Sequence, residues 1–168
     1  MQTATPSILL DYLANLGIKT ETVEHEAVFT VEDSKLITGH LPGVHVKNLF
    51  LCDSKKKMWL ITAPSDVAIN LRALSEVIGS KRLSFGSPMR LLRTLGVTPG
   101  SVSPFCVIND PDQEVQVVLD AWMMKQEQIN AHPLINTKTT TIQAIDLLAF
   151  FQACGHKPVI VDLVHGTS

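Results

Sequence analysis

Two neighbouring polar residues, Lys47 and Asn48, interrupt the otherwise apolar segment GVHVKNLFL at residues 43–51. Alternate residues of a strand point to opposite faces, so each of the two interrupts an apolar face. Burying an unpaired ammonium is costly or forces its deprotonation, so Lys47 needs a partner. That partner is a protein carboxylate or an anion brought by a ligand. Alternatively, the segment is a sheet edge and the lysine side chain reaches water.

A second polar segment, HPLINTKTTTI at residues 132–142, combines an imidazole (His132), an amide (Asn136) and several hydroxyls. It has no helical period, and Pro133 argues against a central strand at that point. Such polar density beside an apolar helix is typical of the rim of a ligand site. A structural histidine followed by β-prone threonines is the alternative interpretation.

A third segment, LGVTPGSVSPF at residues 95–105, contains a Pro-Gly turn. Backbone N–H groups of Gly100 and Ser101 in such a turn can converge on an oxygen atom. A plain type II turn without a binding role is the alternative.

Other catalytic patterns are missing from the sequence. It contains no GxSxG elbow and no HExxH zinc motif. The three cysteines, Cys52, Cys106 and Cys154, are scattered and form no CxxC pair, so we expect buried thiols, no disulfide framework and no structural zinc. We therefore expect neither a metal nor a cofactor.

Composition and charge restrict the class of protein. The chain has 168 residues, of which 45% are hydrophobic, and it predicts one globular domain over residues 1–168. The net charge of −2 does not favour a broadly basic nucleic-acid surface, although basic residues recur at 55–57, 81–82 and 90–93. These local basic groups either contact a few phosphates of a nucleic acid or simply belong to solvent-exposed surfaces. No apolar run could span a bilayer, and residues 1–17 resemble an amphipathic helix rather than a signal peptide, so we expect a cytoplasmic protein without a membrane partner.

Periodicity and cap residues predict the elements that must position these groups. Helix 143–154 is expected to turn Ile145, Leu148, Ala149 and Phe151 inward. Neighbouring strands joined by short turns favour a mixed sheet and the α/β (α+β mixed) class. The expected helices are 6–16, one starting after Thr30, 71–78, 88–95 and 143–154, and the expected strands are 18–25, 44–52, 58–64, 103–110, 114–120, 139–142 and 158–164.

Taken together, the segments KNLFL (47–51), GVTPGSVSPF (96–105) and HPLxNTxTT (132–140) resemble the YbaK/ProX superfamily. Its members are aminoacyl-tRNA deacylases related to the editing domain inserted in bacterial prolyl-tRNA synthetases. The resemblance covers nearly the whole chain and is nearest to the free-standing branch that removes alanine from tRNA(Pro). It implies a mixed sheet, partly rolled into a barrel and flanked by helices.

The resemblance also implies a role for each group in the site. Lys47 contacts the phosphate or ribose at the tRNA 3′ end, and His132 positions the aminoacyl group. Backbone N–H groups of the Gly-Ser loop lie near the scissile carbonyl. The residues it assigns to substrate binding are Thr30, Val31, Asn48, Gly100, Ser101, Val102 and Asn136.

We therefore expect non-covalent hydrolysis, in which water attacks the ester of alanine mischarged on tRNA(Pro). The expected partner is the 3′ end of tRNA(Pro), and a synthetase carrying the tRNA is a second possible partner. Three alternatives stay open: a deacylase for Cys-tRNA(Pro) or another small aminoacyl-tRNA, a non-catalytic module that binds aminoacyl-tRNA or a synthetase, and a hydrolase for small esters or amides.

Overall fold

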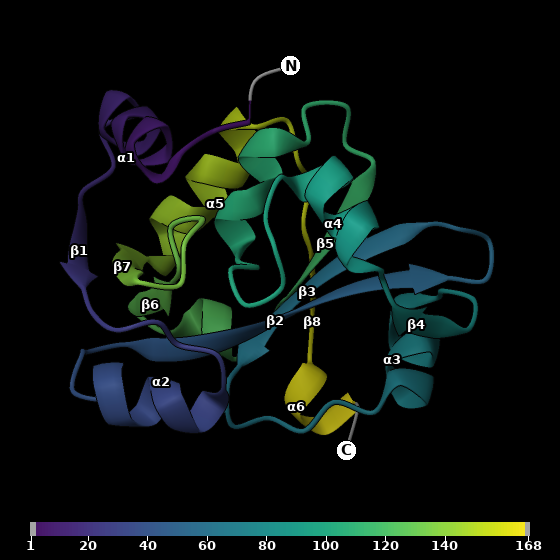
Figure 1. Cartoon of the computed structure of the whole chain (residues 1–168). Helices are drawn as coiled ribbons and strands as arrows, with labels where there is room; N and C mark the ends of the chain where they lie inside the picture. The colour runs from purple at the N-terminus through teal and green to yellow at the C-terminus, as the bar shows by residue number, and fades with distance from the viewer. Residues whose placement is uncertain (1–2, 167–168) are drawn as a thin grey trace.

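A mixed sheet of eight strands forms the centre of the computed structural model, which describes residues 3–166 (Figure 1). The ends of the predicted domain, residues 1–2 and 167–168, lie outside this range. The strand order is β1-β7-β6-β2-β3-β5-β8, and β4 pairs with β2 beside this path. The strands are β1 (Thr20–Glu24), β2 (Val44–Asp53), β3 (Met58–Pro64), β4 (Leu83–Phe85), β5 (Val115–Asp120), β6 (Gln128–Ala131), β7 (Lys138–Gln143) and β8 (Val159–Val161).

Both strand directions occur in this sheet. The β2–β3 hairpin is antiparallel, with Leu49 opposite Ile61, whereas β3 and β5 run parallel. The α/β fold class with a mixed sheet flanked by helices is thus confirmed.

Helices cover both faces of the sheet. Helices α1, α4 and α5 lie on one side, and α2, α3 and α6 lie on the other (Figure 1). No helix among residues 3–166 is long and apolar enough to cross a bilayer. The helices are α1 (Pro6–Asn15), α2 (Val31–Thr38), α3 (Leu71–Ile78), α4 (Pro88–Leu95), α5 (Ala144–Ala153) and α6 (Leu163–Gly166), with 3-10 turns η1 (Pro104–Asn109) and η2 (Met123–Lys125).

Local capping explains where three of these helices begin. The Thr30 hydroxyl accepts the Asp33 N–H at 3.0 Å, Asn70 Oδ1 accepts the Arg72 N–H at 2.9 Å, and Ser87 caps α4 in the same way. Each cap satisfies a backbone donor that has no partner inside the helix.

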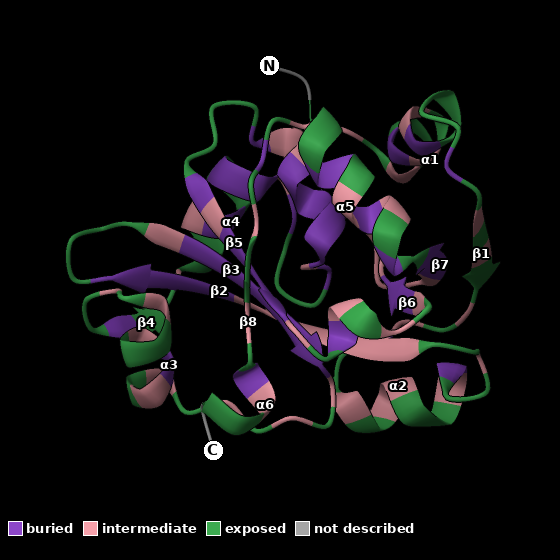
Figure 2. Ribbon diagram, turned by 180° about the vertical axis from the view of Figure 1, so that it is seen from behind, coloured by how far each residue is buried: buried purple, intermediate pink, exposed green. Residues whose placement is uncertain are grey.

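The sheet separates two apolar cores of unequal size. The larger core joins α1, α4, α5 and η1 to the sheet, and within it the Phe105 and Phe150 rings meet edge to face with centroids 5.6 Å apart. The smaller core joins α3 and α6 to the opposite face around Leu74 and Leu163. Helix α2 contributes little to either core, because Thr38 is its only buried residue (Figure 2).

The strand expected at 103–110 is wrong, because this segment forms the 3-10 turn η1. Ser103 accepts the Phe105 N–H at 3.2 Å, and Pro104 occupies the first helical position. An apolar run can be buried as a helical turn as well as a strand, and here the cap and the proline decide between the two.

Three further expectations need correction. The final strand ends at Val161, and residues 163–166 form α6 instead of continuing it. The short strands β4 and β6 were not expected. In α5, Phe151 is buried and Leu148 is half-buried as expected, whereas Ile145 is 72% exposed, Ala149 is exposed, and Leu147 and Phe150 are buried in their place.

Candidate active site

A gap in the pairing of β2 creates the site. On one edge, β2 pairs with β6 at Val44 and His45 and with β4 from Leu51 onward. Among residues 3–166, no strand pairs with this edge between those points, while the other edge stays paired with β3. A cleft of about 240 Å³ lies beside this gap. Seven of the nine predicted site residues line it: Thr30, Val31, Lys47, Asn48, Gly100, Val102 and His132.

Lys47 is half-buried in this cleft, and its ammonium donates a hydrogen bond to the Val67 carbonyl oxygen. Burial lowers the pKa of the Lys47 ammonium, and the nearby charge of Asp66 partly opposes that shift. Within the described chain, Lys47 forms no ion pair. The expected protein carboxylate is therefore not found among these residues, and the expectation of an anion brought by a ligand stays a prediction, because a backbone carbonyl carries no charge. The ammonium remains able to stabilise an anion, since it has further N–H donors.

Asn48 lines the same cleft and is fixed from one side. Its Oδ1 accepts a hydrogen bond of 2.7 Å from the hydroxyl of Thr62, the residue opposite it on β3. Thr62 is fully buried, so this bond holds the amide in one orientation. The Asn48 amide nitrogen is then the group left to donate.

His132 is held through one ring nitrogen. Its Nδ1 lies 2.8 Å from the Lys138 carbonyl oxygen. A carbonyl can only accept, so Nδ1 carries the proton and, in the neutral ring, Nε2 keeps a lone pair. Burial is the main cause that lowers the pKa of His132, with a smaller lowering from His25, while the bond to Lys138 acts in the opposite direction. The ring is therefore biased towards its neutral form.

His25 is a neighbour that the sequence interpretation missed. Its ring centroid lies 6.2 Å from that of His132. His25 Nδ1 is 2.6 Å from the Glu26 carbonyl oxygen, so Nδ1 donates and Nε2 accepts from the Thr139 hydroxyl at 2.7 Å. The segment VEHEAV gave no signal beyond a single polar ring at the end of a predicted strand.

The Pro-Gly loop forms a type II turn. Gly100 has φ +96°, and the Ser101 N–H donates to the Thr98 carbonyl at 3.1 Å. The Ser101 N–H is therefore used inside the turn, and Ser101 is buried outside the cleft lining. Gly100 and Val102 line the cleft, and their N–H groups make no hydrogen bond with any residue in 3–166.

Asn136 also lies outside the cleft lining, although it shapes one wall. The side-chain Nδ2 of Asn136 donates to the Val28 carbonyl at 3.2 Å, and the backbone carbonyl of Asn136 accepts the Val28 N–H at 3.1 Å. These two bonds fix the loop that leads into α2, where Phe29 and Thr30 line the cleft. Phe29 is 73% exposed, so it is not part of the apolar core.

The thiols lie in apolar or partly buried surroundings. Cys52, Cys106 and Cys154 are all free, and complete burial raises the pKa of Cys106 to about 11. Residues 3–166 hold no group of three or more His, Cys, Asp or Glu side chains that could bind a metal ion. The polar groups that line the cleft are an ammonium, an imidazole biased towards its neutral form, an amide, the hydroxyls of Thr30, Ser34 and Ser65, and backbone N–H groups.

Comparison with known proteins identifies the family to which the chain is similar. The model of the aminoacyl-tRNA editing domain matches residues 25–150. The chain is 40% identical over 155 residues to the prolyl-tRNA synthetase associated domain-containing protein 1 of Bos taurus, covering 89% of this chain and 90% of that protein. It is 37% identical over 152 residues to the prolyl-tRNA editing protein ProX of Acetoanaerobium sticklandii, covering 90% and 93% respectively.

One solved structure agrees with the architecture. A crystal structure described as a candidate trans-editing enzyme for prolyl-tRNA synthetase matches with a TM-score of 0.72 at 19% identity, covering 98% of this chain and 99% of that one. At this identity the likeness shows the fold alone.

Proposed function

The chain belongs to the aminoacyl-tRNA editing domain family, and from that premise we propose that it hydrolyses the ester between alanine and the 3′-terminal adenosine of mischarged tRNA(Pro). One observation carries the proposal. Three segments far apart in the sequence, each holding one group that this reaction needs, meet at a single cleft: Lys47, His132 and the turn at Gly100–Val102.

Lys47 binds the phosphate or ribose of the tRNA terminus. Burial disfavours its charged form, as the lowered pKa of the ammonium indicates. An incoming phosphate raises the pKa of the Lys47 ammonium again, because an opposite charge at close range favours the charged form. The Val67 carbonyl orients the side chain without neutralising it. The charge therefore remains available to the substrate.

His132 orients the aminoacyl group. Its Nδ1 is committed to the Lys138 carbonyl, so the ring cannot rotate without losing that bond. The lone pair on Nε2 accepts a hydrogen bond from the α-ammonium of the bound alanyl group. The lowered pKa of His132 supports this role, because only the neutral ring can accept.

The Gly100 turn polarises the scissile carbonyl. The N–H groups of Gly100 and Val102 have no partner among the described residues, so they can donate to the oxyanion that develops. Water adds to the carbonyl carbon, and the bond from that carbon to the ribose oxygen breaks. The water proton goes to the leaving ribose oxygen through the vicinal hydroxyl.

Selection against proline follows from size. Thr30 and Val31, at the start of α2, line the cleft and narrow the space for the amino-acid side chain. A ring overlaps walls that accept one methyl group. Smaller or similar side chains are harder to separate, because one methylene is worth only about 1–3 kcal/mol.

The body of the tRNA is bound outside this cleft. Arg72 on α3 and Arg82 before β4 line a second groove, and Lys81 precedes Arg82. These cations contact phosphates of the acceptor stem. A synthetase that delivers the tRNA is a second partner of the proposed activity.

The decisive experiment is a panel of tRNA(Pro) molecules charged with alanine, cysteine, serine or proline. We expect release of alanine and no release of proline, measured as the charged fraction against time. Faster release of cysteine or serine would transfer the assignment to that amino acid. Binding of charged tRNA without release would indicate a non-catalytic module, and hydrolysis of small alanyl esters at equal efficiency would indicate an enzyme that does not use tRNA.

A further inference from the structure

His45 carries a buried nitrogen that the cleft chemistry does not use. Its Nε2 is shielded from solvent and has no hydrogen-bond partner among residues 3–166. The backbone around it is fixed, because His45 pairs with Asn130 on β6 and its carbonyl accepts the Ser65 N–H at 2.8 Å. Buried polar groups almost always have a partner, so this nitrogen requires an explanation.

A small polar cavity adjoins this nitrogen. It measures about 20 Å³ and is lined by His45 together with Thr38, Asn48, His132 and Thr139. One water needs roughly 10–15 Å³ and two to four polar partners. The cavity shares Asn48 and His132 with the larger cleft, so the two spaces have a common wall. Its size and lining fit a single water molecule.

The hydrogen-bonding capacity of the lining agrees with this occupant. Asn48 Oδ1 is bound to Thr62, its amide nitrogen carries two N–H donors, and Asn48 as a residue lines both spaces. One N–H can therefore face each space. The Thr139 hydroxyl donates to His25 Nε2, which leaves its oxygen lone pairs to accept.

We propose that this cavity is a binding site for one ordered water, and that His45 is a positioning residue acting through it on Asn48. The water donates one hydrogen bond to His45 Nε2 and one to the Thr139 hydroxyl oxygen, and it accepts one from Asn48. The Asn48 amide is then held by Thr62 at its oxygen and by water at its nitrogen. Its second N–H points to the terminal nucleotide in the cleft.

A methyl group in this cavity is the competing occupant, since alanine carries one. It would leave His45 Nε2 and the second N–H of Asn48 without partners. Water satisfies both, so the polar lining favours water. The kinetic consequence of the water site, though not the site itself, rests on the proposed deacylation.

The first test detects the water in the wild-type protein. A high-resolution crystal structure should contain one water within hydrogen-bond distance of both His45 Nε2 and Asn48 Nδ2. In solution, the ¹⁵N shift of His45 Nε2 should be that of a hydrogen-bonded acceptor. A dry cavity, or a ¹⁵N shift of a non-bonded nitrogen, would overturn the proposal. This result is independent of any activity.

The second test is a double-mutant cycle with His45→Leu and Asn48→Ala. His45→Leu should lower kcat/KM for alanyl-tRNA(Pro) by about tenfold, the loss expected for one hydrogen bond in the transition state. In the Asn48→Ala background it should have no further effect, because its influence passes through that amide. His40→Leu, an exposed histidine at the nearby turn, is the matched control and should change nothing.

The outcomes separate this proposal from the proposed function. Additive effects of the two changes, or full activity of His45→Leu, would exclude His45 as a positioning residue for Asn48. A wild-type protein that releases no amino acid refutes the deacylase assignment, while the crystallographic and ¹⁵N measurements still decide the water site.

Discussion

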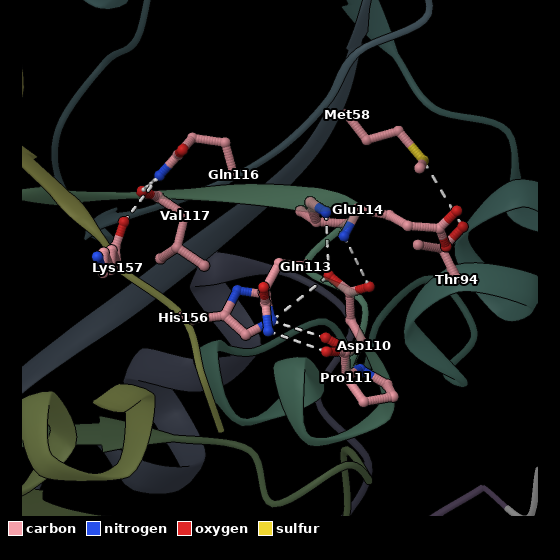
Figure 3. A network of polar contacts seen from close by, with 11 residues as sticks. Met58, Thr94, Asp110, Pro111, Gln113, Glu114, Gln116, Val117, His156 and Lys157 are labelled. Carbon is pink, nitrogen blue, oxygen red and sulfur yellow. Dashed lines mark hydrogen bonds and ion pairs between the residues drawn. The ribbon is translucent and has the colours of Figure 1, made fainter. Parts of the chain in front are cut away.

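Two histidine rings in different regions of the molecule, His156 and His132, differ in whether Nε2 has a partner inside the protein. His156 is 4% exposed, and its Nε2 lies 2.8 Å from the Asp110 carbonyl oxygen and 3.5 Å from Asp110 Oδ2 (Figure 3). The two carboxylate oxygens of Asp110 in turn accept the N–H groups of Glu114 and Val115 at 3.0 and 2.9 Å. His132 instead uses one nitrogen for a backbone carbonyl and keeps the other at a cleft.

This difference separates a structural polar network from a site. The Asp110 network joins η1, β5 and the segment after α5, and every carboxylate oxygen in it has a partner inside the protein. A satisfied buried network stabilises one arrangement of the chain. The cleft retains donors and acceptors that only a ligand can satisfy, which lowers its contribution to stability and leaves it able to bind.

Removal of the cleft ammonium should have the largest effect. Lys47→Ala should reduce kcat/KM for deacylation of alanyl-tRNA(Pro) by about 10³-fold or more. The reason is that the charge stabilises the bound tRNA terminus, including in the transition state. Stability should stay equal or rise, since burial already disfavours the ammonium. Single-turnover kinetics and thermal unfolding measure both quantities.

The control for this change is Lys35→Ala. Lys35 pairs with Asp66 at 3.2 Å on the surface near the cleft, and exposed ion pairs are worth little. We expect that variant to remain within a few-fold of wild type. Lys47→Ala turnover at the same level would remove Lys47 from the mechanism.

Exchange of each imidazole for an amide tests the contrast directly. His132→Gln should lower kcat by about 10²-fold while the free energy of unfolding changes little. His156→Gln should lower the free energy of unfolding by about 1–3 kcal/mol, because it disrupts a buried hydrogen bond to the Asp110 backbone carbonyl. Its folded fraction should keep wild-type activity. Urea denaturation and active-site-normalised turnover distinguish the two, and the opposite pattern would invalidate the contrast.

Local signals in the sequence predicted much of the fold. Thr30, Asn70 and Ser87 marked helix starts correctly, because a cap bonds to N–H groups within three residues of itself. The strands β4 and β6 were missed, since each is short and is stabilised by pairing with distant β2. The segment at 103–110 was misassigned, because its apolar residues fit either a strand or a buried turn.

The sequence predicted which residues form the site better than it predicted their hydrogen-bond partners. The resemblance indicated Lys47, His132 and Gly100, and all three line the cleft. The partners of Lys47 and His132 are the carbonyls of Val67 and Lys138. Every residue carries a backbone carbonyl, so no sequence pattern identifies which one will accept.

The pH dependence of stability should also report on the His132 ring. An unfolded histidine titrates near pH 6.5, and the folded pKa of His132 is lowered. As pH falls below about 6.5, the unfolded chain takes up this proton first, so stability decreases. The loss ends once the folded ring is protonated as well, and above pH 6.5 His132 contributes no slope.

Urea unfolding between pH 8 and pH 5 measures this slope. His132→Gln should have a shallower slope than wild type over the acidic part of the range. Identical slopes for wild type and His132→Gln would show that burial does not disfavour protonation of that ring.

The smallest effect concerns two helix caps, one beside the cleft and one remote from it. Thr30→Ala and Asn70→Ala each remove a side chain that accepts a backbone N–H, so each should cost about 1 kcal/mol of stability. Only Thr30→Ala should also raise KM, because α2 borders the cleft and is weakly packed. Thr30→Ser keeps the capping hydroxyl and should restore both quantities. An equal rise in KM for Asn70→Ala would mean that KM follows global stability and not the position of α2.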